Sequence, residues 1–290
     1  MADHGRAVQA RKPVWKTSSY LVYAGGLTVL GAAVAALGYL AGQYGSGALT
    51  GWALLVLVVL YGVAHMFRVR GRWVAAGIFA FASVIAWAAF VGIAWHWFGW
   101  LDSPGSFGSF SFARLSLEFL VLVAAWDDRR RFGFPFITLI SAVVGWFFII
   151  DLVSSGGTWT KVVTLFVGFA YFVAGSVSDR PSAFWLHLVA GALVGGVFLD
   201  WWHTTDTDWA LISALALVYV GIAHMSKRST WAVYATIGFF GATIHYLYGA
   251  ASTSLLSPHS IAGWAPSVAF ACLGFWFVLL GVLGRRRRTA

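Results

Sequence analysis

Few residues of this chain can do chemistry, because charged residues make up only 10% of the sequence. Glu118 lies near the middle of a long apolar stretch, and Arg114 precedes it by one helical turn. Ionisable side chains inside a membrane segment are costly, and they indicate a functional site by default. One interpretation is a proton or cation site at Glu118, and the other is a pair that neutralises its own charge. His245 and His96, in the outer parts of two other apolar stretches, are further candidates for an intramembrane polar site.

A second group of polar residues lies in one short stretch between two apolar segments. Carboxylates and an imidazole this close together are ligand types that divalent cations accept. The spacing fixes no ligand geometry, and short exposed loops are often acidic. This candidate outer cation cluster consists of Asp200, His203, Asp206 and Asp208.

Two histidines end a segment that occurs twice. Trp52 to Met66 and Trp209 to Met225 both begin with Trp-Ala-Leu and both end with Ala-His-Met. Paired haem ligation by His65 and His224 would need both imidazoles to face each other at one depth. An interfacial position beside basic residues explains the two histidines adequately. The usual motifs of phosphate-binding loops, serine hydrolases and zinc peptidases are missing. We predict no cofactor.

The composition identifies the elements that must position these residues. Hydrophobic residues make up 60% of the chain, and the mean hydropathy is +0.80. Soluble domains are about 45–50% apolar and about 25% charged. The apolar runs are long and continuous, which excludes a β-barrel and predicts an all-α transmembrane bundle in a lipid bilayer. The net charge of +9 does not indicate nucleic acid, because retention of Lys and Arg on the cytoplasmic side explains it.

A transmembrane helix needs about 20 apolar residues, and we count about ten candidate stretches. Several are separated by turn-forming residues such as Gly45-Ser-Gly47 and Ser257-Pro258. The predicted spans are 19–41, 51–67, 73–97, 109–126, 134–153, 160–178, 182–202, 207–225, 230–250 and 262–284.

The basic residues predict the orientation. If the N-terminus is cytoplasmic, 17 of the 19 Lys and Arg residues fall on the cytoplasmic side. The two exceptions are Arg114 and Lys161. This bias supports ten spans in a bacterial plasma membrane, with both termini in the cytoplasm. Most tryptophans then lie at headgroup level, where amphipathic rings are favoured.

The repeated segment also predicts the domain organisation. Its two copies lie six spans apart, so they have the same orientation and form a possible parallel repeat. This parity counts against the drug/metabolite-transporter family, whose halves are inverted. Two glycine pairs, Gly38 with Gly42 and Gly191 with Gly195, serve either close packing or a homo-oligomer. The predicted parts are a basic segment 1–17, a four-span half 18–131, a two-span hairpin 132–180, a four-span half 181–284 and a basic tail 285–290.

The chain also resembles a group of proteins. The motifs Tyr23-Ala-Gly-Gly26 and Phe184-Trp-Leu-His187, with the Gly- and Trp-rich runs, are similar to those of uncharacterised polytopic membrane proteins of high-GC actinobacteria. The resemblance covers most of the chain and contains no catalytic motif. That group has no assigned activity, so the resemblance implies a multi-pass membrane fold and no functional residues.

Three functions are compatible with these observations. The favoured one is a transporter-like permease for a small solute or ion, centred on Glu118 and His245. The second is a non-catalytic structural or assembly subunit of the cell envelope. The third is a membrane enzyme or cofactor carrier, which the missing motifs make the weakest.

A Glu118→Gln variant tests the favoured hypothesis, because it removes the charge and keeps the shape of the side chain. We expect transport to be lost with the fold intact, since a proton or cation site needs the carboxylate. Uptake into cells and gel filtration in detergent measure these two properties. Unchanged uptake would count against a site at Glu118.

Overall fold

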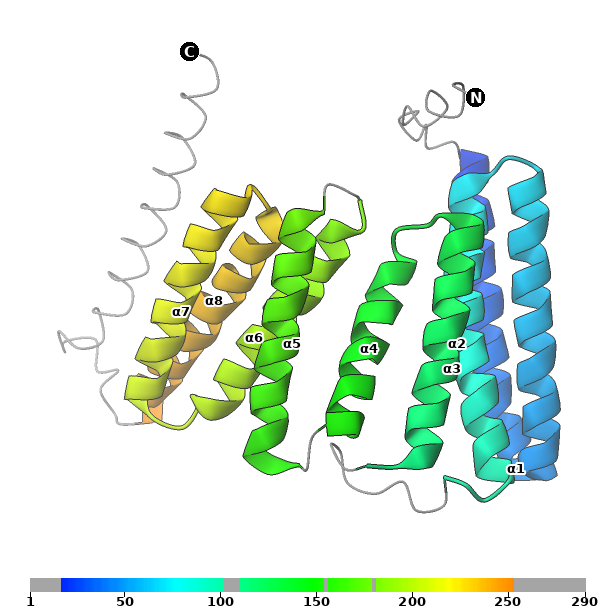
Figure 1. Cartoon of the computed structure of the whole chain (residues 1–290), viewed down its shortest axis with the longest axis horizontal. Coiled ribbons are helices and arrows are strands. Elements are labelled where there is room, and N and C mark those ends of the chain that lie inside the picture. Colours follow the sequence, from blue (N-terminus) through cyan, green and yellow to red (C-terminus); the bar gives the residue numbers. More distant parts are fainter. Residues whose placement is uncertain (1–16, 102–109, 154–155, 179–180, 253–290) are drawn as a thin grey trace, which may run out of the picture. The chain divides into compact units, whose positions relative to one another are not determined.

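The computed structural model describes residues 17–101, 110–153, 156–178 and 181–252. All regular structure in these residues is helical (Figure 1). The helices are α1 (Thr17–Val69), α2 (Trp73–Trp97), α3 (Phe112–Phe132), α4 (Ile137–Val153), α5 (Gly157–Val177), α6 (Ala183–Trp201), α7 (Asp206–Ser226) and α8 (Ser229–Ser252).

These helices coincide with the predicted apolar stretches. Helix α1 covers the first two, and its two parts meet at Gly45, where the backbone leaves the helical region with φ 74° and ψ 179°. Glycine suits this position because it adopts a positive φ without steric strain. Helices α2 to α8 each cover one of the next seven predicted spans. The predicted tenth span, 262–284, lies outside the described residues.

Five helical segments in the described residues are long and apolar enough to cross a membrane. They support a helical membrane protein, while the count of ten spans is still a prediction. Helix α4 is also apolar but has only 17 residues. The five segments are Gln43–Val69, Trp73–Trp97, Gly157–Val177, Ala183–Trp201 and Asp206–Ser226.

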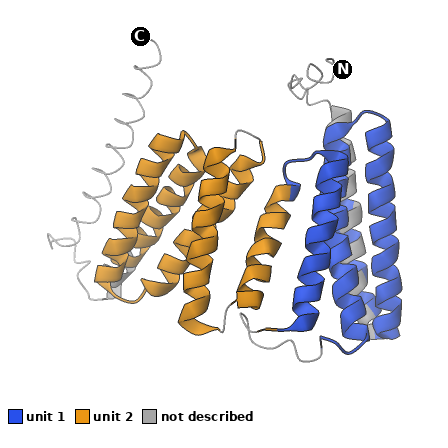
Figure 2. Cartoon of the chain, viewed as in Figure 1, with its two compact units in different colours: residues 1–106, 111–137 blue, residues 107–110, 138–290 orange. Residues whose placement is uncertain are grey.

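The chain divides into two compact units (Figure 2). Unit 1 comprises residues 1–106 and 111–137 and contains α1, α2 and α3. Unit 2 comprises residues 107–110 and 138–290 and contains α4 from Thr138 onward and the helices α5 to α8.

Helix α2 is the centre of unit 1. On one side, Ala82 and Ala86 pack with Leu60 of α1 in a buried cluster. On the other side, the Trp95 indole donates a hydrogen bond to Ser116 Oγ of α3 over 2.8 Å. The Trp87 indole donates to a carbonyl oxygen of α3 over 3.2 Å. Small side chains therefore allow close approach to α1, and indole donors connect α2 to α3.

The core of unit 2 is built around aromatic residues of α7 and α8. The Tyr219 hydroxyl donates to the Gly191 carbonyl over 3.0 Å, and the Tyr234 hydroxyl donates to the Leu188 carbonyl over 2.7 Å. The buried Trp231 indole donates to His187 Nδ1 over 3.1 Å. All three bonds end on α6, so these rings both fill the core and fix α6 against the α7–α8 hairpin.

The glycines Gly191 and Gly195 allow this close packing. A Cβ atom at Gly191 would lie 2.5 Å from Tyr234 Cδ2, and one at Gly195 would lie 3.2 Å from the Tyr219 hydroxyl. These two glycines therefore face aromatic rings of the same chain. The surroundings of Gly38 and Gly42, the other predicted pair, lie outside the described residues.

Residues related by the sequence repeat have different surroundings. Trp73 is 58% exposed, whereas its counterpart Trp231 is 2% exposed. Tyr61 accepts a hydrogen bond from Arg131 over 3.0 Å, whereas Tyr219 donates to a helix carbonyl. Other pairs of the repeat are alike in burial, since His65 and His224 are both exposed and Trp52 and Trp209 are both partly buried. The parallel repeat is still a prediction from sequence.

A Gly191→Ala variant tests the packing of α6. We expect it to be about 1–3 kcal/mol less stable than Gly196→Ala, because the added methyl group collides with Tyr234. At Gly196 an added Cβ meets no atom within 4 Å, and both variants gain the same helix propensity. Thermal unfolding in detergent measures the difference, and equal midpoints would contradict this packing.

Candidate functional site

Three helices of unit 2 enclose a cavity of about 410 Å³. Its walls come from α4, α5 and α6, and it reaches the surface of the unit, since Gly196 and Asp200 are exposed. The side chains around it are a mixture of apolar, hydroxyl and charged groups. The lining residues are Trp146, Gly157, Thr160, Lys161, Thr164, Leu193, Gly196, Val197 and Asp200.

The charged part of the cavity is an ion pair between Lys161 Nζ and Asp200 Oδ2. Lys161 lies in the first turns of α5, and Asp200 lies next to the last residue of α6. Both side chains are partly exposed, at 34% and 55%. Water therefore screens the pair, and its contribution to stability is small. The pair lines the open side of the cavity, where both charged groups are accessible.

The deeper polar part is a short hydrogen-bond chain. The Trp146 indole of α4 donates to Thr164 Oγ1 of α5 over 3.1 Å. The Thr164 hydroxyl in turn donates to the Thr160 carbonyl over 2.8 Å. This chain holds the indole ring of Trp146 in the cavity wall. Leu193 and Val197 of α6 supply the apolar side.

Glycines bring α5 and α6 together beside the cavity. A Cβ atom at Gly168 would lie 2.8 Å from Val194 Cγ2, and one at Gly175 would lie 3.1 Å from His187 Cδ2. Near the start of α5, in contrast, the facing residue Gly196 has open space around it. Tight glycine contacts therefore fix the helix pair, and the cavity lies toward the start of α5, which is the predicted outer side.

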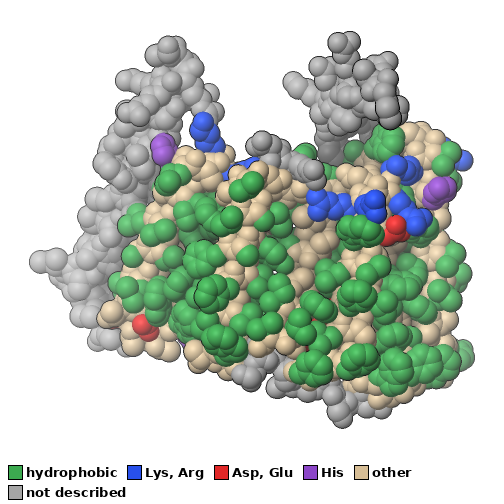
Figure 3. Space-filling view, in the orientation of Figure 1, with side chains coloured by type: hydrophobic (Ala, Val, Ile, Leu, Met, Phe, Trp, Pro, Cys, Tyr) green, Lys and Arg blue, Asp and Glu red, His purple; other side chains and the backbone are tan. Residues whose placement is uncertain are grey.

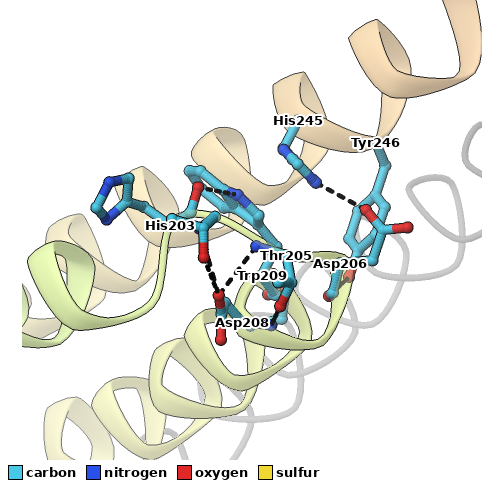
Figure 4. Close-up of polar contacts among 9 residues, drawn as sticks. His203, Thr205, Asp206, Asp208, Trp209, His245 and Tyr246 are labelled. Atoms are coloured by element: carbon cyan, nitrogen blue, oxygen red, sulfur yellow. Dashed lines mark hydrogen bonds and ion pairs between the residues drawn. The ribbon is translucent and has the colours of Figure 1, made fainter.

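The residues of the predicted outer cation cluster have separate partners, and Figure 4 shows those of Asp206 and Asp208. Asp200 pairs with Lys161, and the Asp206 carboxylate lies 2.9 Å from His245 Nε2. Asp208 caps α7, because its Oδ2 accepts from the Thr205 backbone N–H over 2.9 Å while Thr205 Oγ1 accepts from the Asp208 N–H. Among the described residues, no group of three or more His, Cys, Asp or Glu side chains could hold a metal ion. A cation site here is still a prediction from sequence.

His203 and His245 have their own contacts. His203 Nδ1 lies 3.0 Å from the Asp200 carbonyl oxygen, and Figure 4 shows its ring turned away from the Asp206 carboxylate. His245 stacks on Trp209, with ring centroids 4.9 Å apart and planes at 15°. The Tyr246 hydroxyl donates to the Asp206 carbonyl over 2.8 Å. These contacts attach the end of α8 to the start of α7.

The predicted intramembrane polar site is divided between the two units. Glu118 is 8% exposed and belongs to the inward face of α3, together with Leu115 and Val121. Arg114 and His96 also lie in unit 1, and His96 is exposed. His245 lies in unit 2. Glu118 is still a candidate because it is buried, and the four-residue polar site is still a prediction from sequence.

Of the residues that line the cavity, only Asp200 is a candidate from the sequence, as part of the predicted outer cation cluster. One signal was available, because Lys161 is one of only two basic residues predicted outside the cytoplasmic face. A lysine that departs from the positive-inside pattern needs another explanation. Its ion pair with Asp200 in a cavity wall provides one. Trp146 and Thr164 carried no signal, because apolar spans commonly contain both residue types.

The stretch before α7 can be tested for a structural role. We expect Thr205→Ala to lower the free energy of unfolding by about 0.5–2 kcal/mol, because it removes the cap of α7. Thr207→Ala, in the same helical turn, serves as the control and should change stability by less than about 0.5 kcal/mol. Thermal unfolding with and without Ca²⁺ or Zn²⁺ measures both. Strong stabilisation by either ion would instead support a cation site.

Comparison of the chain with family models, with curated proteins and with solved structures found no match.

Proposed function

We propose that this protein is a transporter-like permease that binds a small amphipathic solute in the cavity between α4, α5 and α6. The cavity with its charged rim carries this proposal. A volume of about 410 Å³ falls in the range of about 300–1,000 Å³ that is typical of small-molecule sites. Mostly apolar walls with a few convergent polar groups are also typical of such sites.

The rim and the walls favour a particular class of solute. Lys161 can bind a carboxylate, and Asp200 can bind an ammonium group once the two side chains separate. The ring of Trp146 and the side chains of Leu193 and Val197 favour an apolar body. A small zwitterion with an apolar side chain, such as a neutral amino acid, fits both features.

The membrane topology belongs to the same proposal. We infer ten spans, cytoplasmic termini and a parallel repeat in a bacterial plasma membrane. The Lys and Arg distribution supports this orientation. In this topology the Lys161–Asp200 rim faces outward, so the solute would enter from outside the cell. Self-association through the glycine-rich first span is compatible with this arrangement.

Ligand-induced stabilisation tests the binding site. Purified protein in mild detergent is heated with leucine, phenylalanine, butylamine or butyrate. We expect one of the two amino acids to raise the unfolding midpoint, while butylamine and butyrate, which each carry one charge, act weakly. At a hundredfold excess over Kd the stabilisation amounts to about 2.7 kcal/mol. Lys161→Gln and Asp200→Asn should each remove most of it.

A cavity-filling variant separates binding in the cavity from binding elsewhere. Gly196→Phe should abolish the stabilisation and leave the unfolding midpoint without ligand near that of the wild type, since Gly196 has open space around it. Gly221→Phe, on an exposed face of α7, is the matched control and should keep the response. If Gly196→Phe still responds like the wild type, the solute does not bind in this cavity.

Uptake of the same amino acids into proteoliposomes then separates a permease from a structural subunit. Wild-type protein should accumulate the solute, and Gly196→Phe should not. The envelope-subunit alternative would be favoured if the wild type takes up no amino acid and every cavity variant has the same unfolding midpoint as the wild type with and without ligand.

A further inference from the structure

One end of unit 1 carries six arginines from two separate parts of the chain. Three lie around the turn between α1 and α2, and three lie in the last turn of α3. The Arg68 guanidinium lies 5.7 Å from the centroid of the Phe132 ring, and Arg131 donates to the Tyr61 hydroxyl over 3.0 Å. These contacts bring the two groups together, and Figure 3 shows basic side chains gathered at this end. The arginines are Arg68, Arg70, Arg72, Arg129, Arg130 and Arg131.

Nearby carboxylates neutralise little of this charge. Asp127 pairs with Arg131 over 2.7 Å. Asp128 is 6% exposed and points inward, where its carboxylate accepts from the Ser83 hydroxyl over 3.1 Å. In the part of the chain that the structure describes, four arginines have no carboxylate within ion-pair distance: Arg68, Arg70, Arg72 and Arg130. A concentrated positive charge is therefore available to an anionic partner.

Exposed tryptophans hold two of these arginines in place. The Arg68 guanidinium lies 4.8 Å from the Trp73 ring centroid, and the Arg130 guanidinium lies 4.4 Å from the Trp126 centroid. Trp73 is 58% exposed and Trp126 is 59% exposed. Stacking orders the plane of a guanidinium and leaves its N–H groups free to donate. Positive charge alone would suffice to set topology, so this ordered arrangement indicates recognition.

We propose that this arginine–tryptophan cluster binds the phosphodiester headgroup of an anionic phospholipid. A guanidinium recognises a phosphate through two parallel hydrogen bonds. Apolar side chains beside the arginines, including Val69 at 74% exposure and Val74 at 47%, offer a surface for the acyl chains. Free phosphate or a soluble acidic partner would make no use of this apolar surface. The cluster is therefore a lipid site at the end of the helices that is predicted to face the cytoplasm.

Native mass spectrometry of detergent-purified protein with phosphatidylglycerol or phosphatidylcholine tests the proposal. We expect the wild type to retain phosphatidylglycerol selectively. The triple variant Arg68→Gln, Arg72→Gln, Arg130→Gln should retain it at least about tenfold less. The control Arg285→Gln, Arg286→Gln, Arg287→Gln removes the same charge from the C-terminal run and should bind like the wild type.

Two further variants keep the proposal testable if the loss of three charges disturbs insertion. The triple Arg→Lys variant at positions 68, 72 and 130 keeps the charge but should bind several-fold more weakly, because an ammonium group is not a bidentate donor. Trp73→Leu with Trp126→Leu should weaken binding similarly. The proposal is overturned if both variants bind like the wild type, or if phosphatidylcholine is retained equally. Displacement of the lipid by millimolar inorganic phosphate would instead indicate a free-phosphate site.

Discussion

In an apolar bilayer a hydrogen-bonding group has no water to bind, so every such group needs a partner inside the protein. Helices satisfy the backbone, and many polar side chains of the described residues follow the same rule, although the buried hydroxyl groups of Thr138 and Thr230 have no hydrogen-bond partner there. Thr164 donates to the carbonyl of Thr160, and Thr243 donates to that of Phe239. Tyr219 and Tyr234 reach carbonyl oxygens of a neighbouring helix. The two tyrosine bonds connect different helices, so they fix the rotation of α6 against α7 and α8 in unit 2.

The same constraint decides where charge can lie. In unit 2 the ion pair of Lys161 and Asp200 lies at helix ends, where both side chains remain partly in contact with solvent. In unit 1 the arginines gather at the ends of α1 and α3. Asp128 and Glu118 are the buried carboxylates of α3. Asp128 is accommodated by a hydrogen bond from Ser83, which lowers the cost of its burial.

Two glycines of α6 have different roles: one allows close packing against a neighbouring helix, and the other lines the cavity. Gly191 lies against an aromatic ring, so α6 is held tightly by α8. Gly196, little more than one turn later, faces open space and lines the cavity. On the facing helix, Gly168 and Gly175 provide the close approach that positions α5. The glycine contacts therefore fix the helices whose side chains line the cavity.

The sequence by itself determined the class of protein and the approximate extent of its helices. Both depend on the length and the hydrophobicity of each continuous stretch, which can be read without knowing its neighbours in space. A run such as 73–97 must be helical in an apolar solvent, and the structure has a helix with these bounds. Only the tertiary structure decided which side chains meet. The Lys161–Asp200 pair, the donation from Trp231 to His187 and the stacking of Arg130 on Trp126 all depend on helix rotation. Each residue turns a helix by about 100°, and apolar stretches without a strongly polar face leave that rotation unspecified. The candidate residues Asp206 and Asp208 show the same limit, since they lie only two positions apart in the sequence yet contact His245 and Thr205 separately.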